Sequence, residues 1–237
     1  MDTIIRRVDT STDGRRFYEE VDQEGKRLWC YPSFTTKIDA VYPKDAFLIN
    51  WIREQGLGGQ AIFEKAGEEG TEAHIAIDTL IRGEKVLTED MGLKAKRCVQ
   101  AFLDWNEEFK PEYLESEVMV VNHELKVAGT RDLLCKLNYQ KGKTKYEGTY
   151  VVDYKTSSSL HEKHEIQVAG YWSCTAPGYK TALLHLGNRT EKGYSFKEFD
   201  PVVAFEKFKH FNSTFQMMYP NAEPRIEEFP IYFQLTK

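Results

Sequence analysis

The chain has 237 residues, of which 41% are hydrophobic and 29% charged, values typical of a folded globular protein and not of a disordered or fibrous one. Its length predicts one domain, residues 1–237, with additions around a single core. The formal net charge of −5 does not exclude a nucleic-acid partner, because binding DNA requires only a local basic surface.

The N-terminal half predicts short strands followed by helices. Residues 15–31 have the pattern of two strands about a turn at residues 23–26. Residues 32–36 precede a helix expected at about 44–55, and further helices are expected at about 60–82 and about 90–109. The helix at 44–55 rests on the apolar side chains that share one face, namely Phe47, Leu48, Trp51 and Ile52. We therefore divide the chain into a strand addition at 1–31, a helical part at 32–110 and a sheet core at 111–237.

The C-terminal half predicts the sheet. Strands are expected at 117–121, 127–134 and 149–155, followed by a helix at about 161–175. Two more strands near 180–187 and 194–199 precede a last helix at about 201–218. This order predicts an α/β or α+β fold with a central mixed sheet flanked by helices.

The strongest chemical signal is the pair Asp153 and Lys155 on the expected strand 149–155. Side chains alternate along a strand, so both project from the same side. A hairpin with the strand 127–134 would bring Asp132 beside Asp153, giving two carboxylates of the kind that hard divalent ions bind. A plain salt bridge near a strand end is the alternative, because so short a pattern recurs by chance.

Two further pairs of residues stand at helical spacing. His74 precedes Asp78 by one helical turn, and it is either a third member of the carboxylate site or an ordinary hydrogen-bonded histidine. Asp78 either fixes the imidazole or is solvated, and we favour solvation. Gln167 and Tyr171 share a face of the helix 161–175, where they either pack under the strand or reach a nucleic-acid backbone.

Taken together, these residues resemble the RecB-type branch of the PD-(D/E)XK nucleases. The shared motifs, in chain order, are G-T-x-x-H at 70–74, Glu117, G-x-x-D at 129–132, D-x-K-T at 153–156 and Q-x-x-x-Y at 167–171. Upstream, residues 32–36, the Trp51 helix and Phe63 resemble the mitochondrial genome maintenance exonuclease and its phage and bacterial relatives. The resemblance covers residues 31–175, and beyond them only the order of elements.

The resemblance implies a restriction-endonuclease-like core that hydrolyses phosphodiester bonds in DNA with Mg²⁺ or Mn²⁺. The metal ligands that it implies are His74, Asp132, Asp153 and the backbone carbonyl of Tyr154. The catalytic residues that it implies are Lys155, Asp153, Asp132 and Glu117, with Lys155 orienting or deprotonating the attacking water. Glu117 would hold a water or a second ion, or else be an exposed residue at a strand start. The expected DNA contacts are Ser33, Thr156, Gln167 and Tyr171.

Basic and aromatic side chains offer additional DNA contacts. The basic candidates are Lys136, Lys141, Lys143 and Lys145 near the hairpin, and Lys94, Lys96 and Arg97 on the third helix. Phe34, Trp51 and Tyr171 would stack on bases of a single strand, although aromatic residues at helical spacing are more often part of a core.

The function that we expect is a DNA exonuclease acting on single-stranded ends in replication, recombination or repair. An endonuclease on the same fold and a non-catalytic DNA-binding module are the alternatives, and a structural protein with coincidental motifs is a third. We expect the protein to act alone or with a separate helicase or recombination protein.

The remaining expectations concern cofactors and location. The four cysteines are widely spaced, so we expect no iron–sulfur cluster. No run approaches the roughly 18 apolar residues of a membrane span, and no signal-peptide pattern is present. We therefore expect no membrane partner and a cytoplasmic protein, encoded by a bacterium or a phage.

Overall fold

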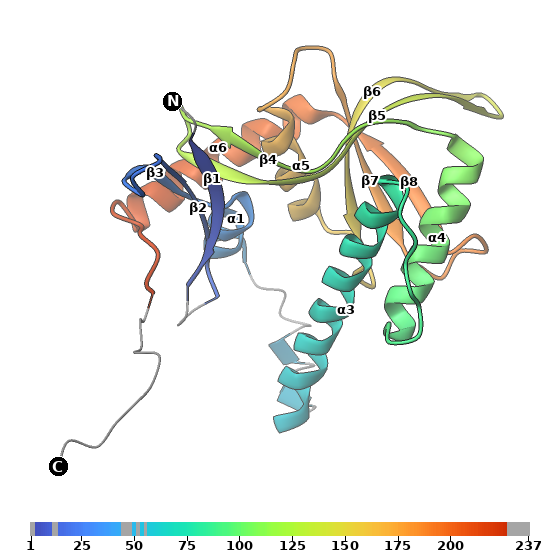
Figure 1. Ribbon diagram of the computed structural model, residues 1–237, viewed down its shortest axis with the longest axis horizontal. Coiled ribbons are helices and arrows are strands. Elements are labelled where there is room, and N and C mark those ends of the chain that lie inside the picture. The colour runs from blue at the N-terminus through green and yellow to red at the C-terminus, as the bar shows by residue number, and fades with distance from the viewer. Residues whose placement is uncertain (1–2, 11–13, 44–48, 51–52, 55, 227–237) are drawn as a thin grey trace.

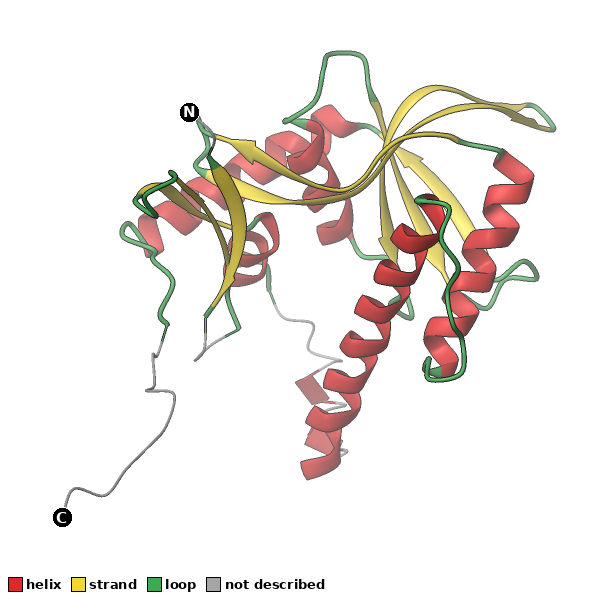
Figure 2. Ribbon diagram, viewed as in Figure 1, coloured by secondary structure: helices red, strands yellow, loops and turns green. Residues whose placement is uncertain are grey.

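The computed structural model describes residues 3–10, 14–43, 49–50, 53–54 and 56–226. Within these ranges, a small three-stranded sheet and a larger five-stranded sheet are accompanied by five named helices (Figures 1 and 2). The predicted α+β class with a mixed sheet and flanking helices is therefore confirmed. None of the helices described is long and apolar enough to cross a membrane.

The small sheet is formed by β1 (Ile4–Asp9), β2 (Arg16–Val21) and β3 (Arg27–Pro32), which are antiparallel in the order β1-β2-β3. The hairpin expected at 15–31 is β2 and β3. The sequence did not predict β1. Its first four residues are two isoleucines followed by two arginines, so apolar and polar side chains do not alternate as they do in a half-buried strand. Buried Glu19 on β2 joins the three strands by ion pairs with Arg6 and Arg27.

Helix α1 (Phe34–Val41) follows β3 directly. Ser33 is its N-cap, and the Ser33 side chain accepts a hydrogen bond from the backbone N–H of Thr36. This helix was not predicted from the sequence, and it begins within the segment 32–36 at the Ser33 cap. The apolar residues on which the expected helix at 44–55 rested lie outside the described residues.

The large sheet has the order β4-β5-β6-β7-β8, with β6 and β7 parallel and all other neighbours antiparallel. Its strands are β4 (Glu112–Asn122), β5 (Val127–Lys141), β6 (Thr144–Lys155), β7 (Lys180–Leu186) and β8 (Tyr194–Phe199). The strands β4, β5 and β6 are all longer than predicted. The additional residues of β5 and β6 form a hairpin that is rich in polar residues. Tyr139 and Tyr146 in that hairpin pack on Phe109, which supports it.

Helices cover both faces of the large sheet. Helices α3 (Leu57–Ile81) and α4 (Leu93–Phe109) pack on one face, against Leu133, Val152 and Leu184. Helices α1, α5 (Glu162–Trp172) and α6 (Pro201–Met218) pack on the other, against Leu134, Val151 and Leu183. The predicted helices at 60–82, 90–109, 161–175 and 201–218 are thus confirmed, with ends shifted by a few residues.

Candidate metal centre

The site begins where β5 and β6 part. The ladder between these strands ends with Leu133 opposite Val152, so Asp132 and Asp153 stand at the next position. The backbone N–H of Tyr154 donates to Oδ2 of Asp132 at 2.7 Å. Asp132 is 7% exposed and Asp153 1%. The predicted hairpin therefore does bring the two buried carboxylates to the same end of the strands.

Glu117 on β4 is the third carboxylate. Its neighbours Ser116 and Val118 pair with Leu133 and Arg131, so Glu117 lies across from Asp132. Its φ is 51°, in the left-handed region, which costs about 1–3 kcal/mol in a residue other than glycine. Its Oε1 atom is buried without a hydrogen-bond donor. The alternative of an exposed residue at a strand start is therefore wrong, because Glu117 lies within β4 and its carboxylate points inward.

His74 on α3 completes a group of three. Its Nδ1 atom lies 3.6 Å from Oε1 of Glu117 and 3.5 Å from Oδ2 of Asp132. One ligand atom from each of these residues lies within 4.8 Å of the others. Sequence spacing could place His74 on a helix, but only the packing of α3 against β4 and β5 brings it to the carboxylates.

The charges in this group are strongly coupled. Burial alone would lower the pKa of His74, but Asp132 and Glu117 outweigh it and raise that pKa to about 10. Burial alone would raise the pKa of Asp132, but His74, Lys155 and the N–H of Tyr154 lower it below its usual value. The imidazole is therefore positively charged and Asp132 is ionised at neutral pH when no metal is bound.

Asp153 and Lys155 form a second pair beside this group. The Lys155 Nζ atom lies 2.6 Å from Oδ2 of Asp153, an ion-pair distance without hydrogen-bonding geometry. Burial raises the pKa of Asp153 to about 7, with Asp132 adding to the rise and Lys155 opposing it. The ligand set expected from the sequence contained His74, Asp132 and Asp153. Within the described residues, the three side chains whose donor atoms lie close enough for one ion are His74, Asp132 and Glu117, so Glu117 takes the place of Asp153. Ligation by Asp153 and by the Tyr154 carbonyl stays a prediction.

Lys155 is held by a chain of hydrogen bonds to α5. Its Nζ atom donates to Oε1 of Gln167 at 3.1 Å, and Nε2 of Gln167 donates to the hydroxyl of Tyr171 at 2.7 Å. Tyr171 is buried against the ring of Phe34. Gln167 and Tyr171 therefore pack beside the strand, the first of the two alternatives, and a contact with a nucleic-acid backbone is not tested by this packing.

The expected DNA contacts differ in exposure. Thr156 is half-buried, whereas Ser33 is 2% exposed and Tyr171 4%, with their hydroxyls engaged inside the protein. Phe34 is 0% exposed, so its expected stacking on bases is wrong for this structure. The roles of Ser33, Thr156, Gln167 and Tyr171 in binding DNA stay predictions.

Asp78 corrects another expectation. It is 6% exposed, it accepts a hydrogen bond from Oγ of Ser116 at 2.7 Å, and it forms an ion pair with Arg82. The favoured interpretation of a solvated Asp78 is therefore wrong, because α3 packs on β4 at this point. Ser116 was not singled out from the sequence, where no local pattern connects it to α3.

Gly70, which opens the histidine motif, has a steric role. A Cβ atom at this position would lie 2.8 Å from Oγ1 of Thr156. The absence of a side chain at Gly70 thus lets α3 approach the residue that follows β6, near the Asp153–Lys155 pair.

The basic side chains proposed for DNA are mostly paired. Lys136, Lys141 and Lys145 form ion pairs with Glu112, Glu108 and Glu147. Lys94 donates to the carbonyl of Ala66. The pairs of Lys136 and Lys145 are exposed on both sides and therefore weak, which leaves these two lysines able to exchange partners.

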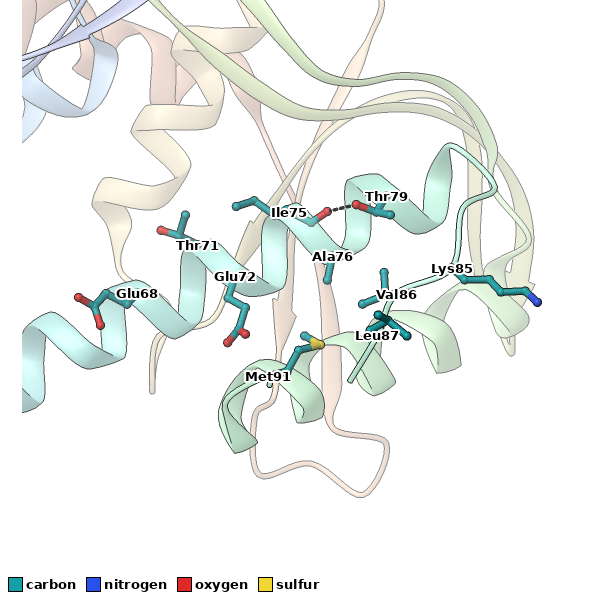
Figure 3. Close-up of a pocket in the computed structure, with 10 residues that line it drawn as sticks. All are labelled: Glu68, Thr71, Glu72, Ile75, Ala76, Thr79, Lys85, Val86, Leu87 and Met91. Atoms are coloured by element: carbon teal, nitrogen blue, oxygen red, sulfur yellow. Dashed lines mark hydrogen bonds between the residues drawn. The ribbon is translucent and has the colours of Figure 1, made fainter. Parts of the chain in front are cut away.

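A pocket of about 680 Å³ lies on another side of α3, between this helix and the loop before α4 (Figure 3). Its apolar lining includes Ile75, Val86, Leu87 and Met91. No residue of the metal-binding group lines this pocket. The candidate centre instead meets solvent through the side chains of His74 and Glu117, which are 26% and 28% exposed.

The residues present fit a divalent cation. Three carboxylates, on Glu117, Asp132 and Asp153, stand against two cationic groups, on His74 and Lys155. The buried Oε1 atom of Glu117 has no hydrogen-bond donor, and the buried Oδ2 atom of Asp153 has only the ammonium of Lys155 beside it. Unsatisfied buried oxygens are costly, and oxygen donors with one imidazole suit Mg²⁺ or Mn²⁺. An ion bound here would supply the missing positive charge.

Comparison with known proteins adds no relative: no family model matches the chain, and no curated protein matches it.

Proposed function

We propose that this protein is a divalent-metal-dependent DNA nuclease, acting as an exonuclease on single-stranded ends. One observation supports this most strongly. His74, Glu117 and Asp132 present their donor atoms together within 4.8 Å, beside the Asp153–Lys155 pair. A metal ion held next to a lysine can hydrolyse a phosphodiester, because the ion acidifies water and both positive charges stabilise the transition state.

In this proposal His74, Glu117 and Asp132 would hold the ion, with Asp153 as a further carboxylate beside them. The ion, when bound, supplies positive charge for the phosphate and acidifies water at the site. A nitrogen ligand slightly favours Mn²⁺ over Mg²⁺. A bound ion also removes the need for a charged imidazole, because His74 must be neutral to act as a ligand.

Lys155 is the group that acts on the reacting atoms. Its side chain is 16% exposed, and its Nζ atom lies 2.6 Å from Oδ2 of Asp153. It orients the attacking water and stabilises the negative charge that builds on the phosphate in the transition state. Gln167 keeps Lys155 in place from α5, since it accepts a hydrogen bond from Nζ.

The test is degradation of end-labelled linear single-stranded DNA with Mg²⁺, with Mn²⁺ and with EDTA. We expect metal-dependent loss of full-length DNA with wild type and none with Lys155→Ala. Lys207→Ala is the matched control, because this exposed lysine pairs with Glu162 on the surface. Equal cleavage by Lys155→Ala and Lys207→Ala would refute the assignment of Lys155.

The same assay separates the alternatives. Circular single-stranded DNA survives an exonuclease and is cut by an endonuclease. An absence of cleavage with either metal, together with metal-independent retention of DNA in a gel-shift assay, would support the non-catalytic binding module.

A further inference from the structure

A buried carboxylate lies one helical turn beyond His74 on α3, and the proposed chemistry does not use it. Asp78 accepts a hydrogen bond from Oγ of Ser116 on β4 at 2.7 Å and pairs with Arg82 one turn further along α3. Asp78 is only 6% exposed, so water contributes little to holding its charge. The hydrogen bond with Ser116 connects α3 to β4 at this point.

Ser116 immediately precedes Glu117, the residue with the left-handed backbone. Neighbouring side chains of a regular strand point to opposite faces. Here both reach α3: Ser116 meets Asp78, and Oε1 of Glu117 lies 3.6 Å from Nδ1 of His74. The left-handed conformation of Glu117 interrupts the alternation at this point.

Such a conformation persists only where the surrounding contacts enforce it. The carboxylate of Glu117 is attracted by the imidazole of His74, 3.6 Å away, but its Oε1 atom accepts no hydrogen bond, so no directional contact of its own fixes the backbone. The hydrogen bond between Ser116 and Asp78 acts on the adjacent residue and holds β4 against α3. His74 and Asp78 share one helix, so the same contact sets the separation of His74 from Glu117.

We propose that Asp78 and Ser116 are positioning residues, which hold Glu117 within reach of the ion that His74 and Asp132 bind. This inference rests on the metal centre of the proposed function but not on its reaction. Neither residue touches the ion or the substrate, and both act through Glu117.

The test is Mn²⁺ binding by isothermal titration calorimetry to the metal-free full-length protein. Ser116→Ala and Asp78→Ala should weaken Mn²⁺ binding by about 10-fold or more, as the loss of residues that orient ligands does. Asp78→Asn retains an oxygen that accepts from Ser116, so it should bind nearly as wild type does. Arg82→Ala, which removes only the other partner of Asp78, is the matched control and should also bind normally.

A double mutant separates positioning from a general loss of structure. In a Glu117→Ala background, which has no ligand atom at this position, the Ser116→Ala change should have almost no further effect on Mn²⁺ affinity. An equal loss in both backgrounds, or no loss in Ser116→Ala, would overturn the proposal. Thermal unfolding in EDTA checks that each variant is folded.

The outcomes also separate this inference from the nuclease function. Wild type that binds no Mn²⁺ would refute both. Wild type that binds Mn²⁺ through coupled Ser116 and Glu117, yet cleaves no DNA, would support the positioning role and refute the nuclease.

Discussion

Replacing Asp153 by asparagine should make the metal-free protein more stable at pH 8. The Asp153 side chain is almost completely buried, and this burial outweighs the attraction of Lys155, 2.6 Å from its Oδ2 atom, so its charge is costly to keep in the folded state. Asparagine has nearly the same shape and no charge. The remaining groups then balance, with Glu117 and Asp132 against His74 and Lys155.

The magnitude follows from the pKa of this carboxyl. Burial raises the pKa of Asp153 to about 7 in the folded protein, whereas an unfolded chain gives about 4. Between about pH 4 and about pH 7 the carboxyl of Asp153 is still protonated in the folded protein but ionised in the unfolded chain. The free energy of unfolding therefore falls as the pH rises from about 4 to 7. The full difference corresponds to about 4 kcal/mol. Lys155 loses its nearest partner in the variant, so we expect a net gain of about 1–2 kcal/mol at pH 8.

The assay is urea unfolding in EDTA at pH 5 and pH 8. Asp153→Asn should exceed wild type in stability at pH 8 and approach it at pH 5, where Asp153 is protonated. Asp39→Asn, which changes an exposed carboxylate paired with Lys163, is the control and should differ little at either pH. A variant less stable than wild type at pH 8, or a gap that is the same at both pH values, would refute the reasoning.

Two further predictions concern the backbone of β4 and a buried lysine on α1. At position 117, Glu117→Gly should be more stable than Glu117→Ala by about 1 kcal/mol in urea unfolding, because only glycine adopts φ 51° without strain. At Val118, a regular strand position, the order should reverse, and alanine ranking above glycine at both positions would contradict this account. Burial, together with a smaller effect of the charge on Lys126, lowers the pKa of Lys37 to about 7. The unfolded chain therefore holds a proton that the folded protein has lost, and stability should rise from about pH 7 to 10 by up to about 1.4 kcal/mol per pH unit. Lys37→Met should remove this rise relative to wild type, and parallel pH profiles of the two proteins would exclude it.

The sequence predicted the parts of the fold that carry long, regular patterns. The apolar spacing of α3 and α4 extends over several turns, and the alternation around Asp153 and Lys155 identifies a strand end and its chemistry. A local signal for α1 was also present, since Ser33 is a favoured N-cap residue, but it was not used.

What the sequence could not predict depends on contacts between distant segments. Nothing in the residues around Glu117 indicates a left-handed backbone, since glycine, asparagine and aspartate are the usual residues there. The burial of Asp78 arises from Ser116 on another element, so helical spacing alone could not distinguish a buried from a solvated carboxylate.

The ring of Phe34 has a consequence for how mutational data on this protein should be interpreted. It fills the space left by two glycines: a Cβ atom would lie 2.8 Å from the ring at Gly129 and 2.4 Å from it at Gly170. Gly129 precedes Asp132 on β5, and Gly170 precedes Tyr171 on α5. A screen for essential positions would therefore identify both glycines and the phenylalanine together with the charged residues. Their intolerance to change would reflect volume shared among α1, β5 and α5, and it would carry no information about the reaction.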